Sequence, residues 1–322
     1  MMKQEQINLA VQEVLAQIDA TSVPANEILN HYTRTHRYIG SKDRKFLTQR
    51  VWDELRARLT PKWIQKVIAQ KELKAMNKPA DFILRVNGDR NTVQKQLAAQ
   101  GIMTKLTPLS PLGLICEKRI DLNTIDQYKS GKIEVQDEGS QLVALATGIR
   151  ANDTVLDYCA GAGGKSLCFA WMMQGKGKIV AHDISKRSLQ ELQKRAQRAG
   201  VKIETTLKPQ GVFSQVVVDA PCSGSGTWRR CPDARLKLTE KQVKNLVKLQ
   251  AEILDKASQF VAPNGKLHYM TCSLLEAENQ TQMRTFLKRH LEFKLIHHQQ
   301  WTPATTDTDG FFLASFERMN NG

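Results

Sequence analysis

The decisive stretch of this sequence reads Val216-Val217-Val218-Asp219-Ala220-Pro221-Cys222-Ser223-Gly224-Ser225-Gly226-Thr227-Trp228. Three consecutive β-branched residues predict a short buried strand. Pro221 fixes its own φ and ends the strand, so Cys222 is expected on a stiffened loop. Gly224 and Gly226 would let the backbone approach a planar ligand closely. The alternative is a structural cysteine at an ordinary strand end, which is the usual role of an isolated Pro-Cys pair.

A second strand end carries another cysteine. Tyr269-Met270-Thr271-Cys272-Ser273 follows an apolar run and continues into a polar turn. The carboxyl ends of parallel strands meet at one edge of a sheet, where ligands bind. The sequence therefore predicts that Cys222 and Cys272 face one pocket.

Strands and helices alternate through residues 135–322, which predicts an α/β fold with a mainly parallel, doubly wound sheet. The expected strands are 154–158, 178–182, 203–207, 216–218 and 266–270, followed by two late strands near 293–296 and 311–316. Residues 1–72 predict a helical domain, with Ser41 and Thr60 as N-caps. Residues 73–134 predict a small ferredoxin-like α+β module in which Asn91 caps a helix. This module either contacts RNA or packs against the large domain.

The charge balance indicates a polyanionic partner. The chain has 322 residues, 47 Lys and Arg against 32 Asp and Glu, and a net charge of +15. Between Ser41 and Lys78 there are 11 basic and 4 acidic residues, which favours a surface that faces phosphates over a merely solvated helix face.

The six cysteines form no Cys-x-x-Cys pair, so we expect no metal site and a reducing, cytoplasmic setting. No apolar run approaches the length of a membrane span, and we expect a monomer.

A glycine turn, Cys159-Ala160-Gly161-Ala162-Gly163-Gly164-Lys165, follows the strand that ends near Asp157. A phosphate-binding P-loop would need glycine at position 159, and a dinucleotide fingerprint would need glycine at position 166. The remaining interpretation is S-adenosylmethionine (SAM), which carries no phosphate. Asp183 is placed at the end of the next strand, where it can accept hydrogen bonds from both ribose hydroxyls.

The motifs 159–165, 219–227 and 271–273 together resemble the signatures of the RsmB/Sun family of SAM-dependent RNA (cytosine-5) methyltransferases. Residues 135–140 and 309–312 are also similar to that family, and Gly-Ser-Lys-Asp-Arg at 40–44 resembles its NusB-like, RNA-binding N-terminal domain. One departure concerns the third strand. The family pattern has an acidic residue after it, but here Lys208-Pro209-Gln210-Gly211 follows.

The chemistry of cytosine explains why such a site needs thiols. Addition of a thiolate to carbon 6 activates carbon 5 towards a methyl sulfonium, and Asp219 is the candidate to offset charge at ring nitrogen 3. The residues alone leave the order of the two thiols open, because both lie at strand ends. The resemblance implies that Cys272 is the nucleophile, that Cys222 assists product release and that Lys165 holds Asp219.

The resemblance also implies a Rossmann-like sheet, SAM as cofactor and RNA as partner, either ribosomal or transfer RNA. The cofactor residues it implies are Cys159, Ala160, Gly161, Ala162, Gly163, Gly164, Lys165, Asp183 and Asp219. Trp228-Arg229-Arg230 predicts a surface that stacks on bases and grips phosphates, with a core tryptophan as the alternative. A catalytically silent RNA-binding protein of the same fold is the rival function, although it would not need both cysteines.

Overall fold

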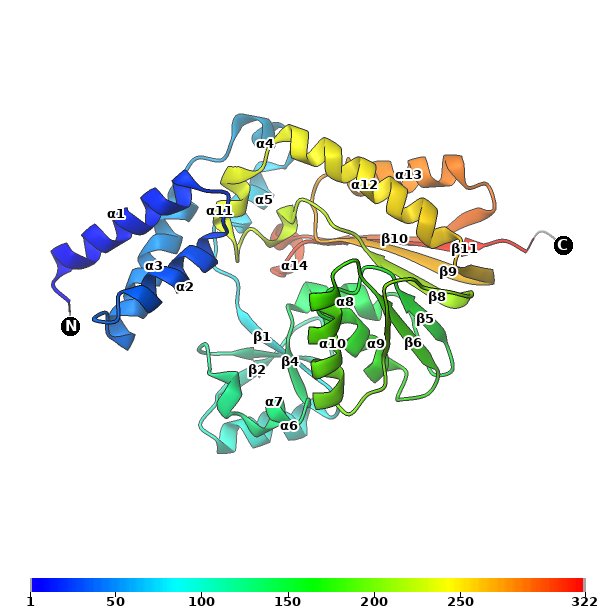
Figure 1. The fold of residues 1–322 in the computed structure, drawn as a ribbon, viewed down its shortest axis with the longest axis horizontal. Coiled ribbons are helices and arrows are strands. Elements are labelled where there is room, and N and C mark those ends of the chain that lie inside the picture. The colour runs from blue at the N-terminus through cyan, green and yellow to red at the C-terminus, as the bar shows by residue number, and fades with distance from the viewer. Residues whose placement is uncertain (1, 321–322) are drawn as a thin grey trace.

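The computed structural model describes residues 2–320, which form a helical part, a small α+β part and a larger α/β part (Figure 1). The helical part contains α1 (Gln4–Ala20), α2 (Ala25–Thr35) and α3 (Ser41–Ala57), followed by α4 (Lys62–Val67) and α5 (Gln70–Ala75). The first three helices bury one shared apolar core that includes Val14, Leu29 and Val51. Each such side chain stabilises the packing by about 1.5–3 kcal/mol.

Three predicted N-caps are wrong. Gly40, not Ser41, is the N-cap of α3, and Pro61, not Thr60, is the N-cap of α4. The helix that Asn91 was expected to cap, α6, begins at Arg90, so Asn91 lies inside its first turn. Asp89 is the cap, because its carboxylate accepts a hydrogen bond from the backbone N–H of Thr92 at 2.7 Å.

The small module has a ferredoxin-like arrangement. Its elements are β1 (Phe82–Val86), α6 (Arg90–Ala99), β2 (Thr104–Leu106), β3 (Gly113–Cys116), η1 (Leu122–Thr124), α7 (Asp126–Lys129) and β4 (Ile133–Val135). The antiparallel sheet has the order β2-β3-β1-β4, and its helices cover one face. Glu134 on β4 is ion-paired to Arg195 at 2.9 Å and to Arg198 at 2.5 Å. The module is therefore held against the large domain by a charged contact.

The large part contains a seven-stranded sheet of order β10-β11-β9-β8-β5-β6-β7. Its strands are β5 (Thr154–Asp157), β6 (Lys178–His182), β7 (Glu204–Thr206), β8 (Phe213–Asp219), β9 (Val261–Thr271), β10 (Phe293–Trp301) and β11 (Phe311–Arg318). Strands β9, β8, β5, β6 and β7 are parallel, and the pair β10 and β11 joins β9 antiparallel. The doubly wound, mainly parallel α/β sheet is thus confirmed.

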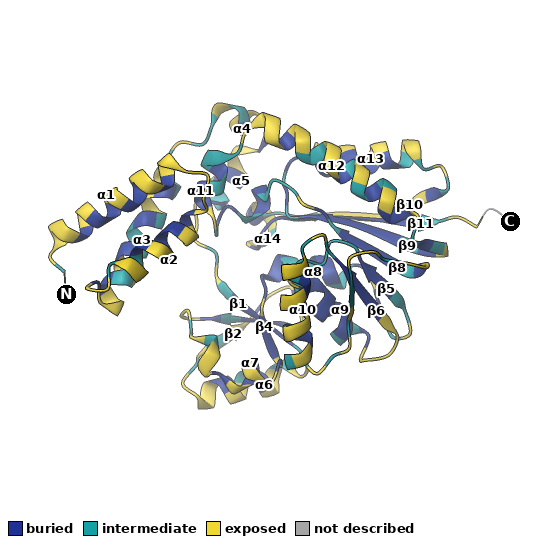
Figure 2. Ribbon diagram, viewed as in Figure 1, coloured by how far each residue is buried: buried dark blue, intermediate teal, exposed yellow. Residues whose placement is uncertain are grey.

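Helices cover both faces of this sheet (Figure 1). On one face lie α12 (Glu240–Ser258) and α13 (Gln280–Arg289); on the other lie α8 (Glu138–Leu145), α9 (Gly164–Met172) and α10 (Lys186–Arg198). Strands β5, β6, β8 and β11 are buried along most of their length, whereas the edge strand β10 and the outer faces of the helices are largely exposed (Figure 2). Two short helices, α11 (Pro232–Lys237) and α14 (Pro303–Thr306), contact the helical part through α3 and α5.

The register of the two central strands sets the position of the cysteines. Val218 is paired with Tyr269, and Asp219 with Met270, in a parallel ladder. The strands therefore end side by side, and the loops that carry Cys222 and Cys272 leave the same edge of the sheet. No helix within residues 2–320 combines the length and apolarity that a bilayer crossing requires.

Candidate active site

The two strand-end cysteines meet. Cys222 Sγ lies 3.4 Å from Cys272 Sγ, which is hydrogen-bonding distance for two thiols. The pKa of Cys222 is raised well above its ordinary value, first by the hydrogen bond with Cys272 and then by burial and by the charges of Cys272 and Glu278. The sequence prediction that both thiols face one place agrees with this geometry.

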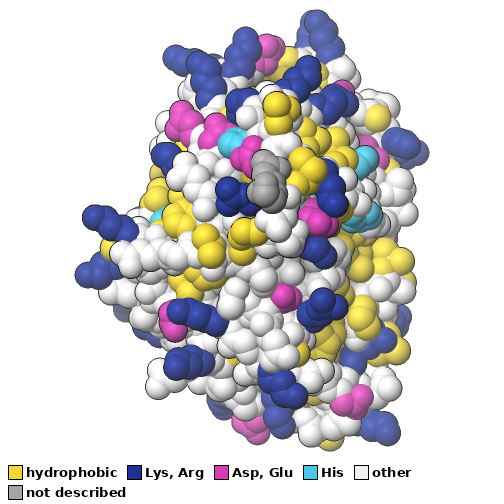
Figure 3. Space-filling view, turned by 90° about the vertical axis from the view of Figure 1, so that its right-hand side faces the viewer, with side chains coloured by type: hydrophobic (Ala, Val, Ile, Leu, Met, Phe, Trp, Pro, Cys, Tyr) yellow, Lys and Arg dark blue, Asp and Glu magenta, His cyan; other side chains and the backbone are white. Residues whose placement is uncertain are grey.

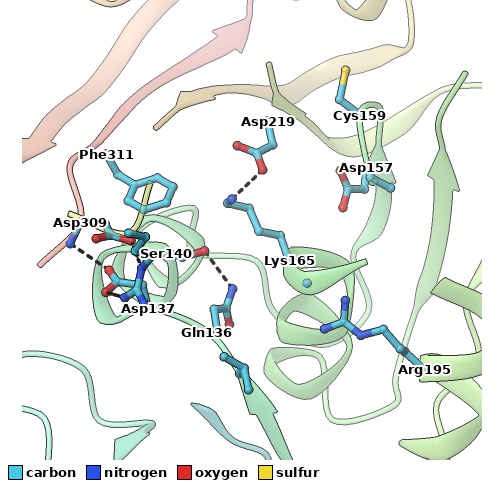
Figure 4. Close-up of a pocket in the computed structure, with 14 residues that line it drawn as sticks. Gln136, Asp137, Ser140, Asp157, Cys159, Lys165, Arg195, Asp219, Asp309 and Phe311 are labelled. Carbon is cyan, nitrogen blue, oxygen red and sulfur yellow. Dashed lines mark hydrogen bonds and ion pairs between the residues drawn. The ribbon is translucent and has the colours of Figure 1, made fainter. Parts of the chain in front are cut away.

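Lys165 and Asp219 form an ion pair beside the thiols. Lys165, on the first turn of α9, places its Nζ 2.6 Å from Asp219 Oδ2 at the end of β8 (Figure 4). Burial alone would lower the pKa of Lys165, but the charge and hydrogen bond of Asp219 outweigh it, and the pKa is raised. The same Nζ lies 5.1 Å from the centre of the Phe311 ring, a cation–π contact. Lys165 is therefore a fixed cation in this site.

The glycine turn 159–165 leaves room for a ligand beside its backbone. A Cβ at Gly161 or Gly164 would meet no atom within 4 Å, so both residues leave empty space in front of the backbone. Gly161 and Gly163 both have φ in the left-handed region, at +52° and +84°, but at Gly163 the space is filled, because a Cβ there would clash with Leu192. Asp183 stabilises the turn through backbone hydrogen bonds. Its carboxylate accepts hydrogen bonds from the N–H groups of Gly161 at 2.9 Å and Ser185 at 2.8 Å.

A cavity of about 380 Å³ lies between this turn and the segment that enters α8. Asp157, Cys159, Ala160, Gly164, Lys165 and Asp219 line one side, and Gln136, Asp137, Asp309 and Phe311 line the other (Figure 4). This volume lies within the range of small-molecule sites.

Asp157 at the end of β5 adds an incompletely bonded carboxyl group to the cavity. Its Oδ2 accepts from Ser166 Oγ at 2.6 Å, while its buried Oδ1 has no partner among the described residues. Burial, opposed by the Ser166 hydrogen bond, raises the pKa of Asp157 to about 7. A ligand with a hydrogen-bond donor would satisfy this oxygen. The open glycines, the cavity and Asp157 together fit a nucleoside-like cofactor such as SAM.

The two flanking motifs, 135–140 and 309–312, come together at the far wall of the cavity. Asp309 donates its backbone N–H to Asp137 Oδ1 at 3.0 Å. Arg230 donates to Asp137 Oδ2 at 2.6 Å and to Asp309 Oδ2 at 2.5 Å. Burial and the neighbouring Asp137 raise the pKa of Asp309 to about 6, although Arg230 opposes the shift. Arg230 is thus the cation that holds these two segments together.

Two predictions for the loop after β8, residues 220–230, are wrong. Trp228 and Arg229 are only 1% and 2% exposed, so they cannot stack on bases. Trp228 packs in a core with Ile64, Leu73 and Leu275, and Arg229 Nη1 binds Asp307 Oδ1 at 2.7 Å. Gly226 does not approach a ligand, since its backbone lies against Gly310, whose N–H donates to the Gly226 carbonyl at 2.8 Å.

Glu278 is the residue that the sequence interpretation missed. It lies in the turn after β9, is completely buried, and accepts hydrogen bonds from the loops of both cysteines. Nothing in its local sequence distinguishes it from the exposed Glu276 two residues earlier. Nowhere in residues 2–320 do three His, Cys, Asp or Glu side chains gather in a group suited to a metal ion.

A doubly wound sheet with an open glycine turn after β5, a ligand-sized cavity beside that turn and an acidic residue after β6 defines the class of SAM-dependent methyltransferases, although Asp183 itself does not line the cavity. The family model "16S rRNA methyltransferase RsmB/F" matches residues 144–317. The chain belongs to this family, and SAM is the cofactor of these methyltransferases.

Individual relatives agree with this assignment. The chain is 31% identical over 272 residues to a probable ribosomal RNA small subunit methyltransferase B of Bacillus subtilis, with 74% of this chain and 60% of the relative covered. It is 30% identical over 307 residues to ribosomal RNA small subunit methyltransferase B of Xylella fastidiosa, with 86% and 72% covered. The chain thus spans less than two thirds of the Bacillus relative.

A solved structure shares the fold. NSun6 from Pyrococcus horikoshii, determined with SFG, superposes with a TM-score of 0.73 at 18% identity, over 83% of this chain and 98% of that one.

Proposed function

We propose that this protein transfers a methyl group from SAM to carbon 5 of a cytosine in ribosomal RNA, through a covalent cysteine adduct. The observation that carries the proposal is the 3.4 Å contact between Cys222 and Cys272, beside the Lys165–Asp219 ion pair. The names of the relatives support ribosomal RNA as substrate, with transfer RNA as the alternative.

We further propose residues 135–322 as the catalytic domain, 73–134 as a separate module and 1–72 as an RNA-binding domain. We also propose that the protein is a monomer that acts in the cytoplasm.

The first step belongs to Cys272. Its thiolate adds to carbon 6 of the cytosine, an S–C bond forms, and the electron pair of the C5=C6 bond moves to carbon 5. Bound SAM supplies the electrophilic methyl group that carbon 5 takes up. Negative charge develops at ring nitrogen 3, and the Lys165–Asp219 pair stabilises it, with Lys165 as the cation and Asp219 as the hydrogen-bond acceptor for the proton that this nitrogen takes up. The target base must leave any stack to reach the thiol.

Release requires a base near Cys272. The carbon-5 proton leaves to that base, the C5=C6 double bond is restored, and the S–C bond breaks to return the thiolate. Cys222 is the candidate. A charged Cys272 raises the pKa of Cys222, and that effect ends once Cys272 is bonded to carbon. Cys222 therefore gives up its proton more readily in the adduct, which is when a base is needed.

Bisulfite sequencing of RNA from cells with and without this protein tests the proposal. We expect one or a few cytosines that resist conversion only when the protein is present, and restoration by the wild-type chain but not by Cys272→Ala. RNA binding without any change in conversion would instead identify a catalytically silent RNA-binding protein.

A further inference from the structure

A single buried carboxylate joins the two cysteine loops. Glu278 Oε1 accepts from the backbone N–H of Ser223 at 2.9 Å, and its Oε2 accepts from Ser223 Oγ and Ser273 Oγ, each at 2.5 Å. Gln250 Nε2 donates to Glu278 Oε1 at 3.0 Å. Ser223 directly follows Cys222, and Ser273 directly follows Cys272. The same carboxylate therefore binds the residue next to each thiol, through the backbone and hydroxyl of Ser223 and the hydroxyl of Ser273.

Glu278 is buried among neutral hydrogen-bond donors. Within residues 2–320 no Lys, Arg or His forms an ion pair with it, and its four donors are neutral groups of Ser223, Ser273 and Gln250. These hydrogen bonds compensate the carboxylate for the hydration that it loses on burial. Its field is screened weakly in such surroundings.

The charges around the two thiols differ in sign. Glu278 acts on Cys222, and its charge is one of the causes that raise the pKa of that thiol. Lys165 is the cation coupled to Cys272, because a charged Cys272 raises the pKa of Lys165. An anion that acts on one thiol and a cation that is coupled to the other make the two cysteines chemically unequal although they touch.

We propose that Glu278 is a positioning residue that holds both thiols at 3.4 Å and keeps Cys222 protonated, so that the thiolate forms on Cys272. The consequence for catalysis, namely that Cys272 attacks and Cys222 serves release, rests on the proposed function. The difference in reactivity between the two thiols does not rest on the proposed function, because it exists in the protein without RNA.

The test is thiol reactivity without RNA. The variant Glu278→Gln removes the charge and keeps the size of the side chain, and mass spectrometry follows iodoacetamide labelling of each cysteine at neutral pH. The titratable groups that face Cys222 are Cys272, Glu278 and Tyr269. We expect labelling of Cys222 to become about tenfold faster in Glu278→Gln, which corresponds to one pKa unit. Glu278→Asp, which keeps the charge, should leave Cys222 slow.

Glu276→Gln is the matched control. Glu276 lies in the same turn but is exposed and is paired with Arg284 at 2.6 Å, so its neutralisation should leave both thiols unchanged. Unchanged labelling of Cys222 in a folded Glu278→Gln variant would overturn the proposal. If that variant does not fold, the pH profile of Cys222 labelling in the wild-type protein decides. A labelling midpoint of Cys222 above that of Cys272 supports the proposal, because the charge of Glu278 acts on Cys222, and equal or reversed midpoints refute it.

These outcomes separate the inference from the proposed function. Different reactivity of the two thiols without any methylation of RNA would support the role of Glu278 and reject the proposed reaction. Methylation by the wild-type protein, together with unchanged labelling of Cys222 in Glu278→Gln, would support the proposed reaction and reject the role of Glu278.

Discussion

Gly161 donates its backbone N–H to Asp183 Oδ2 at 2.9 Å, which connects the glycine turn after β5 to the end of β6. Each carboxylate oxygen of Asp183 accepts one backbone hydrogen bond and retains a second lone pair, which faces no described partner. The residue expected to bind the ribose hydroxyls thus also shapes the turn. Replacement by alanine would disturb both roles at once.

Asp183→Asn is therefore the more informative variant. We expect SAM to bind about 10- to 100-fold more weakly, because a charged acceptor for the ribose hydroxyls is removed. Isothermal titration measures the affinity, and urea unfolding of the same variant shows whether the turn still supports the fold. Full affinity in a folded variant would remove Asp183 from the cofactor site.

The second prediction concerns the basic face of α3. Figure 3 shows that Lys and Arg side chains are spread widely over another face of the molecule, at the C-terminal end, so charge alone does not locate the RNA site. Reversal to Glu of four residues of α3 should weaken RNA binding and lower the slope of log K against log salt by about 0.7 for each phosphate that the variant no longer neutralises. The residues are Lys42, Arg44, Lys45 and Arg50.

A control with the same change in net charge comes from α12. Four of its lysines are exposed, and their reversal should reduce the salt slope less than reversal on α3; these are Lys241, Lys244, Lys248 and Lys256. Equal effects of the two sets in a salt titration would mean that α3 contributes only net charge.

The third prediction uses the raised pKa of Asp157. An unfolded aspartate ionises near 3.8, whereas burial keeps the folded Asp157 protonated up to about 7. The folded state thus binds the proton more tightly, and its stability falls as pH rises from about 4 to 7, by at most about 4 kcal/mol. In Asp157→Asn this contribution disappears. Urea unfolding at pH 5 and pH 8 should therefore show a smaller loss of unfolding free energy for the variant than for the wild type, and equal losses would contradict the assignment.

The sequence predicted those parts of the fold that depend on local patterns. The apolar run 216–218, the glycine turn and the order of the motifs placed the parallel sheet and the meeting of Cys222 with Cys272, because parallel strands end at one edge. Helix starts were displaced by one or two residues where several polar residues competed for the cap, as at Asp89 and Asn91.

The errors concern residues whose role depends on distant contacts. Trp228 was expected on the surface, but α4, α5 and the 274–275 segment cover it. Glu278 and Glu276 look alike in sequence, and only the approach of the two cysteine loops makes one a buried acceptor and leaves the other exposed. Tertiary packing of this kind has no periodicity or spacing that a single sequence displays.

The last prediction assigns the two thiols. If Cys272 attacks carbon 6, Cys272→Ala has no covalent route, and neither methylated RNA nor a protein–RNA adduct should form. If Cys222 serves release, Cys222→Ala still attacks and methylates, but the product stays bonded to Cys272. That variant should accumulate a complex that survives denaturing gel electrophoresis, and its cross-linked peptide should contain Cys272.

The exposed Cys231 supplies the control, because Cys231→Ala should turn over normally and trap nothing. The reverse pattern, with Cys272→Ala trapped and Cys222→Ala inert, would exchange the roles. It would also conflict with the charges that act on the pair, since the charge of Glu278 raises the pKa of Cys222, whereas Lys165 is the cation coupled to Cys272. Turnover in both variants without any adduct would exclude a thiol mechanism. Within residues 2–320 the remaining cysteine beside the Lys165–Asp219 pair is Cys159, and burial raises the pKa of that thiol far above its ordinary value.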